Sequence, residues 1–163
     1  MTTEKLIDLS NFSLEGMDKQ GHEFYLNLEK AKSIIISDPR IQSDSYGLFG
    51  EVTTCGLETK EKWEASRNRA IRLDLDFRLQ INKSILWLRY VNKIQNVNTK
   101  HSSYGLKHYV ERYLKTSKYP ENNYVCNGAF IIAAKLCEFK IYGLGNVCFN
   151  MSERSIKSLS NCH

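Results

Sequence analysis

The segment from Ile71 to Ile94, IRLDLDFRLQINKSILWLRYVNKI, decides how this chain folds. Between Ile71 and Ile81 apolar and polar residues alternate, which is the two-residue period of a strand. A second pattern, with apolar residues at steps of three or four, competes with it and continues well beyond residue 81, as in an amphipathic helix. The apolar positions of this second pattern are Leu73, Phe77, Ile81, Ile85, Leu88, Val91 and Ile94.

Residue preferences in this segment favour the helix. β-Branched residues are sparse between positions 72 and 80, where leucine, arginine and glutamine, all good helix formers, predominate. Neither glycine nor proline occurs between Gly56 and Gly105. We therefore predict a long helix from about Thr59 to Ile94, with an interruption allowed near Asn82. A strand over residues 71–81 remains the alternative.

Two further helices are predicted after this segment. Ser102 or Ser103 is a good N-cap for a helix that runs to Leu114. The next helix, 129–139, is apolar on nearly every side and should therefore be buried, with Asn127 as its cap. Phe130, Ile131, Ala134 and Leu136 of this second helix are expected to form the centre of the C-terminal core.

The remaining C-terminal elements are shorter. Residues 96–100 are polar and are expected to form a connection. Two β-prone stretches within 141–150 flank the sequence Gly143-Leu144-Gly145-Asn146, which predicts a hairpin. Ser152 is expected to begin a last short helix.

The N-terminal third has weaker signals. Residues 1–22 show no period and are expected to form an irregular arm. Residues 24–36 fit either a pair of strands or a short helix followed by a strand, and 42–56 fit a loop or hairpin. We predict one α+β domain over 1–163, predominantly helical and compact. Its part from 1 to 58 is irregular and contains β structure, and its part from 59 to 163 is mainly helical.

Composition and cysteine usage indicate the compartment. The chain has 163 residues, of which 42% are hydrophobic and 25% charged, as in ordinary single domains. It contains no apolar stretch long enough to span a bilayer and no secretory signal, so no membrane partner is expected. Five widely spaced cysteines without a C-x-x-C pair indicate reduced thiols rather than a disulfide framework. We expect a cytoplasmic protein, in a bacterium or in a host cell.

The positive charge is concentrated in one segment. Residues 83–118 hold eight lysines and arginines but one acid, Glu111, and they also hold Trp87 and several tyrosines. Cations attract phosphates, and aromatic rings stack on exposed bases. The competing interpretation is a solvated helix face whose aromatic rings lie in the core. The candidate binding residues are Lys83, Arg89, Lys93, Lys100, Tyr104, Lys107, His108, Arg112, Lys115 and Lys118.

Catalytic signals are weak. Cys126 precedes a helix start, where the helix dipole lowers a thiol pKa, and His101 or His108 is the candidate base. A cysteine that packs in the core is the better interpretation. No sequence motif for a nucleotide cofactor is complete, and the histidines lack the carboxylates of a metal site, so neither cofactor nor metal is expected.

Four stretches of the C-terminal part are considered together: Ser102–His108, Val110–Arg112, Tyr124–Ile131 and Asn146–Ser152. They resemble a pattern in small accessory proteins of phages and plasmids, and the resemblance covers about the last 65 residues. It implies a mobile-element gene and, as a class, a regulatory or counter-defence role. It transfers no catalytic residue.

These observations predict a non-catalytic binding protein of a phage or plasmid. Its basic segment would contact nucleic acid or a host nucleoprotein complex, with Lys107, Arg112 and Lys115 on the exposed face of the 103–114 helix. The first alternative is an inhibitor or regulator that docks on an acidic host protein. The second is a small enzyme that uses cysteine and histidine.

Overall fold

A computed structural model describes residues 28–51, 59–116 and 123–161, and its described part contains six helices and three strands. The predicted class, α+β and predominantly helical, is confirmed. In chain order the elements are α3 (Leu28–Ser37), α4 (Lys60–Arg72), α5 (Leu75–Leu88), β1 (Lys93–Asn98), α6 (Ser103–Lys115), α7 (Asn127–Leu136), β2 (Ile141–Tyr142), β3 (Cys148–Met151) and α8 (Glu153–Ser160).

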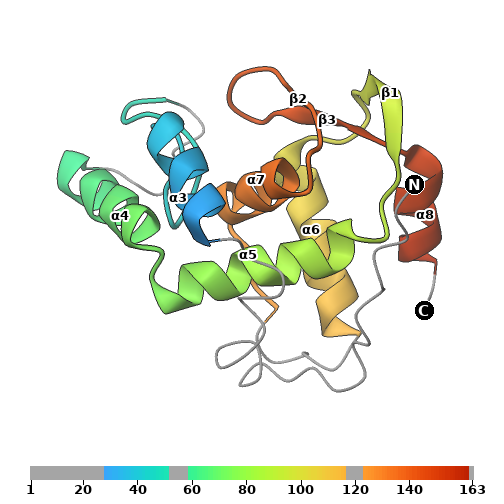
Figure 1. The fold of residues 1–163 in the computed structure, drawn as a ribbon, viewed down its shortest axis with the longest axis horizontal. Helices are drawn as coiled ribbons and strands as arrows, with labels where there is room; N and C mark the ends of the chain where they lie inside the picture. Colours follow the sequence, from blue (N-terminus) through green and yellow to red (C-terminus); the bar gives the residue numbers. More distant parts are fainter. Residues whose placement is uncertain (1–27, 52–58, 117–122, 162–163) are drawn as a thin grey trace.

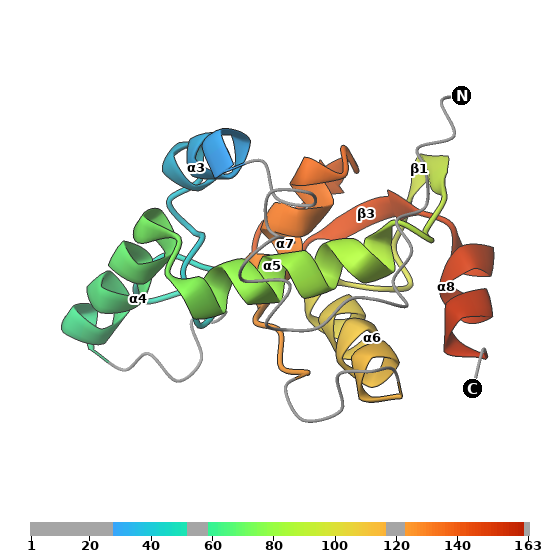
Figure 2. The same cartoon turned by 60° about the horizontal axis from the view of Figure 1, so that its bottom comes forward.

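Helix α5 crosses the middle of the molecule (Figure 1). It packs mainly on α7 and also on α6, while α4 continues beyond its first end. The small sheet and α8 lie at its other end, an arrangement that is also visible after the rotation in Figure 2. The sheet is antiparallel, in the order β1-β3-β2. Helix α6 packs on α5 and α7 in the core and also contacts α8.

Residues 71–72 and 75–88 of this segment are helical, so the helix interpretation of residues 71–81 is confirmed, but the prediction of a single long helix to Ile94 is wrong. Helix α4 ends where Leu73 adopts a left-handed backbone conformation, with φ of 50°. The Leu73 N–H donates to the carbonyl of Ala70 at 2.9 Å, which closes the last turn. The interruption thus lies at Leu73, not near Asn82, and α5 ends at Leu88.

Strand β1 lies where the sequence predicted the end of a helix, at Ile94, and a connection, at 96–100. Both predictions are wrong, because Ile94 and most of 96–100 belong to the strand. Four of its six residues are polar, and its two apolar residues, Ile94 and Val97, do not alternate with them, so no period of two marks the strand. Side chains help to hold it against β3: Asn150 Nδ2 donates to the Ile94 carbonyl at 3.0 Å, and Asn98 Nδ2 donates to the Met151 carbonyl at 3.2 Å. The β2–β3 hairpin and the Ser152-capped helix α8 are confirmed.

The strand expected around Ile34–Ile36 is also wrong, because these residues belong to α3. Ala31 and Ile35 are buried, four positions apart, whereas Ile36 is exposed, which is the period of a helix. Residues 42–51 form a loop, and an isolated antiparallel bridge joins Tyr46 in this loop to Ile41 before it. The expectations for residues 1–22, for 24–27 and for 52–56 lie outside the described residues.

Helix α7 is buried as predicted, and residues 129–134 have no exposed surface. It begins at Asn127 and is capped by Cys126 rather than by Asn127, and it ends at Leu136, short of the predicted 139. Gly128 is required there because an added Cβ would lie 2.5 Å from the backbone oxygen of Gln42. The 42–45 loop therefore packs directly on the start of α7.

Candidate nucleic-acid interface

One open pocket of about 400 Å³ lies between α6 and the end of α8. We call it the α6–α8 pocket. All of its lining residues except the two from α8 belong to the basic segment 83–118. They are Trp87, Tyr109, Arg112, Tyr113, Lys115, Thr116, Leu159 and Ser160.

The pocket combines an aromatic interior with cations at its edge. Trp87 is almost completely buried, and its ring centroid lies 6.5 Å from that of Tyr109. The guanidinium of Arg112 lies over the Tyr109 ring, 4.5 Å from its centroid. Arg112 and Lys115 are both exposed. The pocket thus brings aromatic side chains together with two exposed cations.

The period of α6 explains this placement. Leu106, Val110 and Leu114 follow one another at steps of four, are fully or almost fully buried and fix the helix to the core. Residues at similar steps on the other side, among them Tyr109 and Arg112, face the pocket. Ser102 caps the helix as predicted, and its side chain accepts the Gly105 N–H at 3.3 Å.

Lys107 does not lie on the exposed face, so this part of the prediction is wrong. Only 6% of the residue is exposed, and Lys107 Nζ donates to Glu111 Oε1 at 3.1 Å. The rings of Tyr104 and Tyr124 cover the ammonium, with their centroids 5.2 and 5.3 Å from Nζ. Lys107 is therefore a structural cation rather than a first contact for a ligand.

Glu111 joins α6 to the segment before α7. Besides Lys107, it accepts the backbone N–H of Val125 at 3.1 Å, and His108 Nδ1 lies 2.7 Å from its other oxygen. Burial opposes ionisation, but these hydrogen bonds outweigh it and hold the pKa of the Glu111 carboxyl below its ordinary value. No pattern in the sequence indicates that Tyr124 and Val125 contact side chains of α6 here.

The other predicted cations are spread over the structure. Lys83 is fully buried in α5, and burial lowers the pKa of its ammonium against the attraction of Asp76. Arg89 follows α5 and is partly buried, while Lys93 in β1 and Lys100 before α6 are exposed. Lys118 lies outside the described residues. Among the candidates, the structure brings only Arg112 and Lys115 to the pocket.

Cys126 has the properties of a packing residue. It is fully buried, its Sγ accepts the Ala129 N–H at 3.4 Å, and burial raises the pKa of its thiol to about 12, against the pull of the helix N-terminus. The candidate bases face carboxylates instead: His101 Nε2 lies 2.7 Å from Glu153 Oε2, and His108 pairs with Glu111. This geometry favours the packing interpretation over a nucleophile.

We expect Cys126 to be alkylated more slowly than the half-buried Cys137 and Cys148 in the folded protein near neutral pH, because a buried neutral thiol is a poor nucleophile. Pulsed iodoacetamide labelling followed by peptide mass spectrometry measures the three rates. In denaturant the difference should disappear. If Cys126 reacts first in native buffer, it is an activated thiol and the enzyme alternative gains support.

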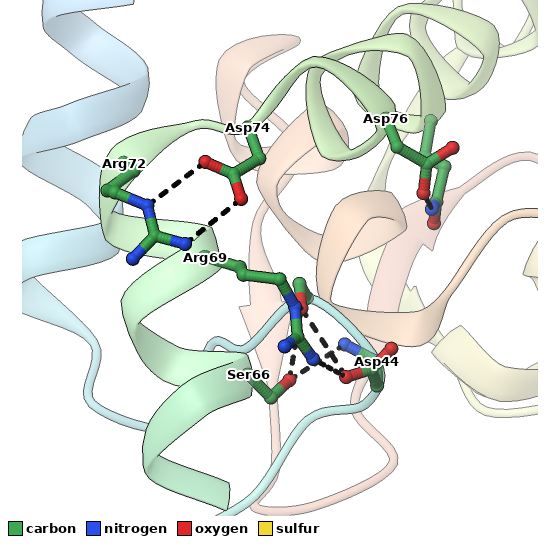
Figure 3. A network of polar contacts seen from close by, with 8 residues as sticks. Asp44, Ser66, Arg69, Arg72, Asp74 and Asp76 are labelled. Atoms are coloured by element: carbon green, nitrogen blue, oxygen red, sulfur yellow. Dashed lines mark hydrogen bonds and ion pairs between the residues drawn. The ribbon is translucent and has the colours of Figure 1, made fainter. Parts of the chain in front are cut away.

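An arginine network elsewhere holds α4 to the loop after α3 (Figure 3). Arg69 forms an ion pair with Asp44 at 2.6 Å, and Arg72 binds Asp74 through two hydrogen bonds, of 3.2 and 3.1 Å. Asp76 lies apart from Asp74 and accepts a hydrogen bond from Gln80. The two aspartates therefore do not form a paired-carboxylate site.

Within the described ranges 28–51, 59–116 and 123–161, no three histidine, cysteine or acidic side chains come together as a metal site requires. None of the helices described is both long and apolar enough to cross a membrane. The sequence matches no protein-family model, and comparison with curated proteins and with solved structures finds no match.

Proposed function

We propose that this protein binds single-stranded nucleic acid through α6 and the α6–α8 pocket, without catalysing a reaction. The observation that carries the proposal is the guanidinium of Arg112 stacked on Tyr109, beside Lys115, at a pocket that Trp87 also lines. The proposal narrows the basic segment predicted from the sequence to one helix. The regulatory or counter-defence role in a mobile element stays a prediction. Binding of nucleic acid is compatible with such a role.

The pocket supplies both interactions that a single strand needs. Arg112 and Lys115 neutralise phosphates and release counterions. An unstacked base would contact the exposed parts of Tyr109 and Tyr113, and about 400 Å³ lies within the usual range for small-ligand sites. A duplex keeps its bases stacked inside, so it would use only the two cations. We therefore expect single strands to bind more tightly than duplexes.

A two-residue variant tests this proposal. Arg112→Ala/Lys115→Ala should weaken binding of a fluorescent oligothymidine about tenfold or more, from a parent dissociation constant of roughly 1–100 μM. The slope of log affinity against log salt should fall by about 1.4, which is two single-strand phosphate contacts. Fluorescence anisotropy at about 50 and 200 mM salt measures both quantities.

Lys60→Ala/Lys62→Ala is the matched control, because it removes the same charge from exposed positions on α4. It should bind nearly as the parent does. Equal losses in the two variants would mean that net charge alone acts. If the parent binds no oligonucleotide at low salt, the proposal fails and the alternative, docking on an acidic protein, takes its place.

A further inference from the structure

We propose that α6 carries a second stacking site, formed by Tyr104 and Tyr124, and that the ligand is therefore a strand of about four nucleotides rather than a single nucleotide. This inference rests on the proposed function and extends its site beyond the α6–α8 pocket. It assigns to two tyrosines from different parts of the chain a shared role that the pocket alone does not require.

The two tyrosines form a fixed and exposed pair. Each is 52% exposed, although Tyr104 lies in the first turn of α6 and Tyr124 precedes α7. The ammonium of Lys107 lies against both rings, and Glu111 holds that ammonium in place. A ring positioned by its neighbours loses less conformational freedom when a base stacks on it, which strengthens binding.

A ridge of α6 leads from this pair to the pocket. Residues 104, 108, 112 and 116 follow at steps of four and thus share one side of the helix. The imidazole of His108 stands edge-on to Tyr104, with centroids 4.8 Å apart, while Arg112 and Thr116 already line the pocket. The two stacking sites are therefore joined by a continuous surface on one element.

The length of this surface sets the size of the ligand. From Tyr104 to Tyr113 the helix rises about 13 Å, at about 1.5 Å per residue. A stacked strand rises about 3.4 Å along its axis for each nucleotide, so the distance corresponds to about four nucleotides. Glu111 is the only acid on α6, and its carboxylate is already engaged by Lys107 and His108, so it opposes a strand less than a free carboxylate would.

A series of labelled oligothymidines of two, four, eight and twelve nucleotides tests the second site. For the parent, affinity should rise about tenfold from the shortest to the four- or eight-nucleotide strand, the gain expected from one stacked base, and little thereafter. Tyr104→Ala/Tyr124→Ala should lose that gain and bind the dinucleotide as the parent does. Thermal melting first verifies that each variant is folded.

Two controls keep the result interpretable. Tyr104→Phe/Tyr124→Phe retains the rings and should keep the length dependence, whereas a loss in that variant would overturn the stacking role. Tyr142→Ala removes a partly exposed tyrosine from the β2–β3 hairpin and should change nothing.

The outcomes separate the two proposals. If strands of all lengths bind equally and Tyr104→Ala/Tyr124→Ala behaves as the parent, while Arg112→Ala/Lys115→Ala loses binding, the second site is wrong and the pocket stands. If no strand binds the parent, both proposals fail.

Discussion

Replacing Phe130 with alanine is expected to lower the free energy of unfolding by about 3–5 kcal/mol. Phe130 is fully buried in α7, and its ring centroid lies 6.3 Å from that of Trp87 and 5.6 Å from that of Phe149. It therefore connects α7 with α5 and β3. Since three elements border the cavity that the substitution leaves, no single side chain can move to fill it.

Urea unfolding followed by circular dichroism measures this change. Leu144→Ala is the matched control: Leu144 is 81% exposed at the tip of the β2–β3 hairpin, and its substitution should change stability by less than about 0.5 kcal/mol. A Phe130→Ala variant that unfolds at the parent's urea concentration would mean that α7 is not the centre of the core. Because Trp87 lines the pocket, the variant should also bind oligonucleotides more weakly.

The elements that the sequence predicted well are those that local chemistry defines. Helix α6 begins after Ser102, whose side chain accepts the Gly105 N–H, and α8 begins after Ser152, whose side chain accepts the Ser155 N–H. A cap acts within three residues, so its signal is present in the sequence itself. Helix α7 is apolar on nearly every side, so its burial could be predicted without knowledge of the topology.

The predictions that were wrong concern elements whose structure depends on residues distant in the sequence. Leu73 takes a left-handed conformation that usually selects glycine, and its side chain is buried, so packing offsets the local cost. Strand β1 has little apolar character of its own and is held in part by the side chain of Asn150 in β3. The residues that pack on Leu73 and the strand that pairs with β1 are distant in the sequence. No local pattern therefore indicates the end of α4 at Leu73 or the presence of β1.

The candidate site was likewise predicted from the sequence only in part. The charge excess of residues 83–118 pointed to the helix that carries Arg112 and Lys115. It did not distinguish these two from Lys83 and Lys107, which are buried. Lys107 is buried in part by Tyr124, which belongs to another segment of the chain. The composition of residues 83–118 alone therefore cannot distinguish buried cations from exposed ones.

Replacing Glu111 with alanine is expected to lower the free energy of unfolding by about 3 kcal/mol, at the low end of the cost of breaking a buried ion pair. The substitution leaves the Lys107 ammonium buried without its carboxylate and the Val125 N–H without its acceptor. The rings of Tyr104 and Tyr124 remain as partial compensation. Urea unfolding near neutral pH measures the loss.

A double variant and the pH dependence show whether the charge itself is responsible. Lys107→Met/Glu111→Gln removes both charges but keeps an acceptor for Val125, so it should be within about 1 kcal/mol of the parent, as replaced buried pairs often are. Because folding lowers the Glu111 pKa, its contribution is complete above the ordinary value of 4.5 and decreases as the pH falls through the lowered pKa. The stability difference between the parent and Glu111→Ala should therefore shrink in acid. A difference that stays constant from neutral pH to well below 4.5 would mean that Glu111 acts through packing, and the second stacking site would then lack its anchored cation.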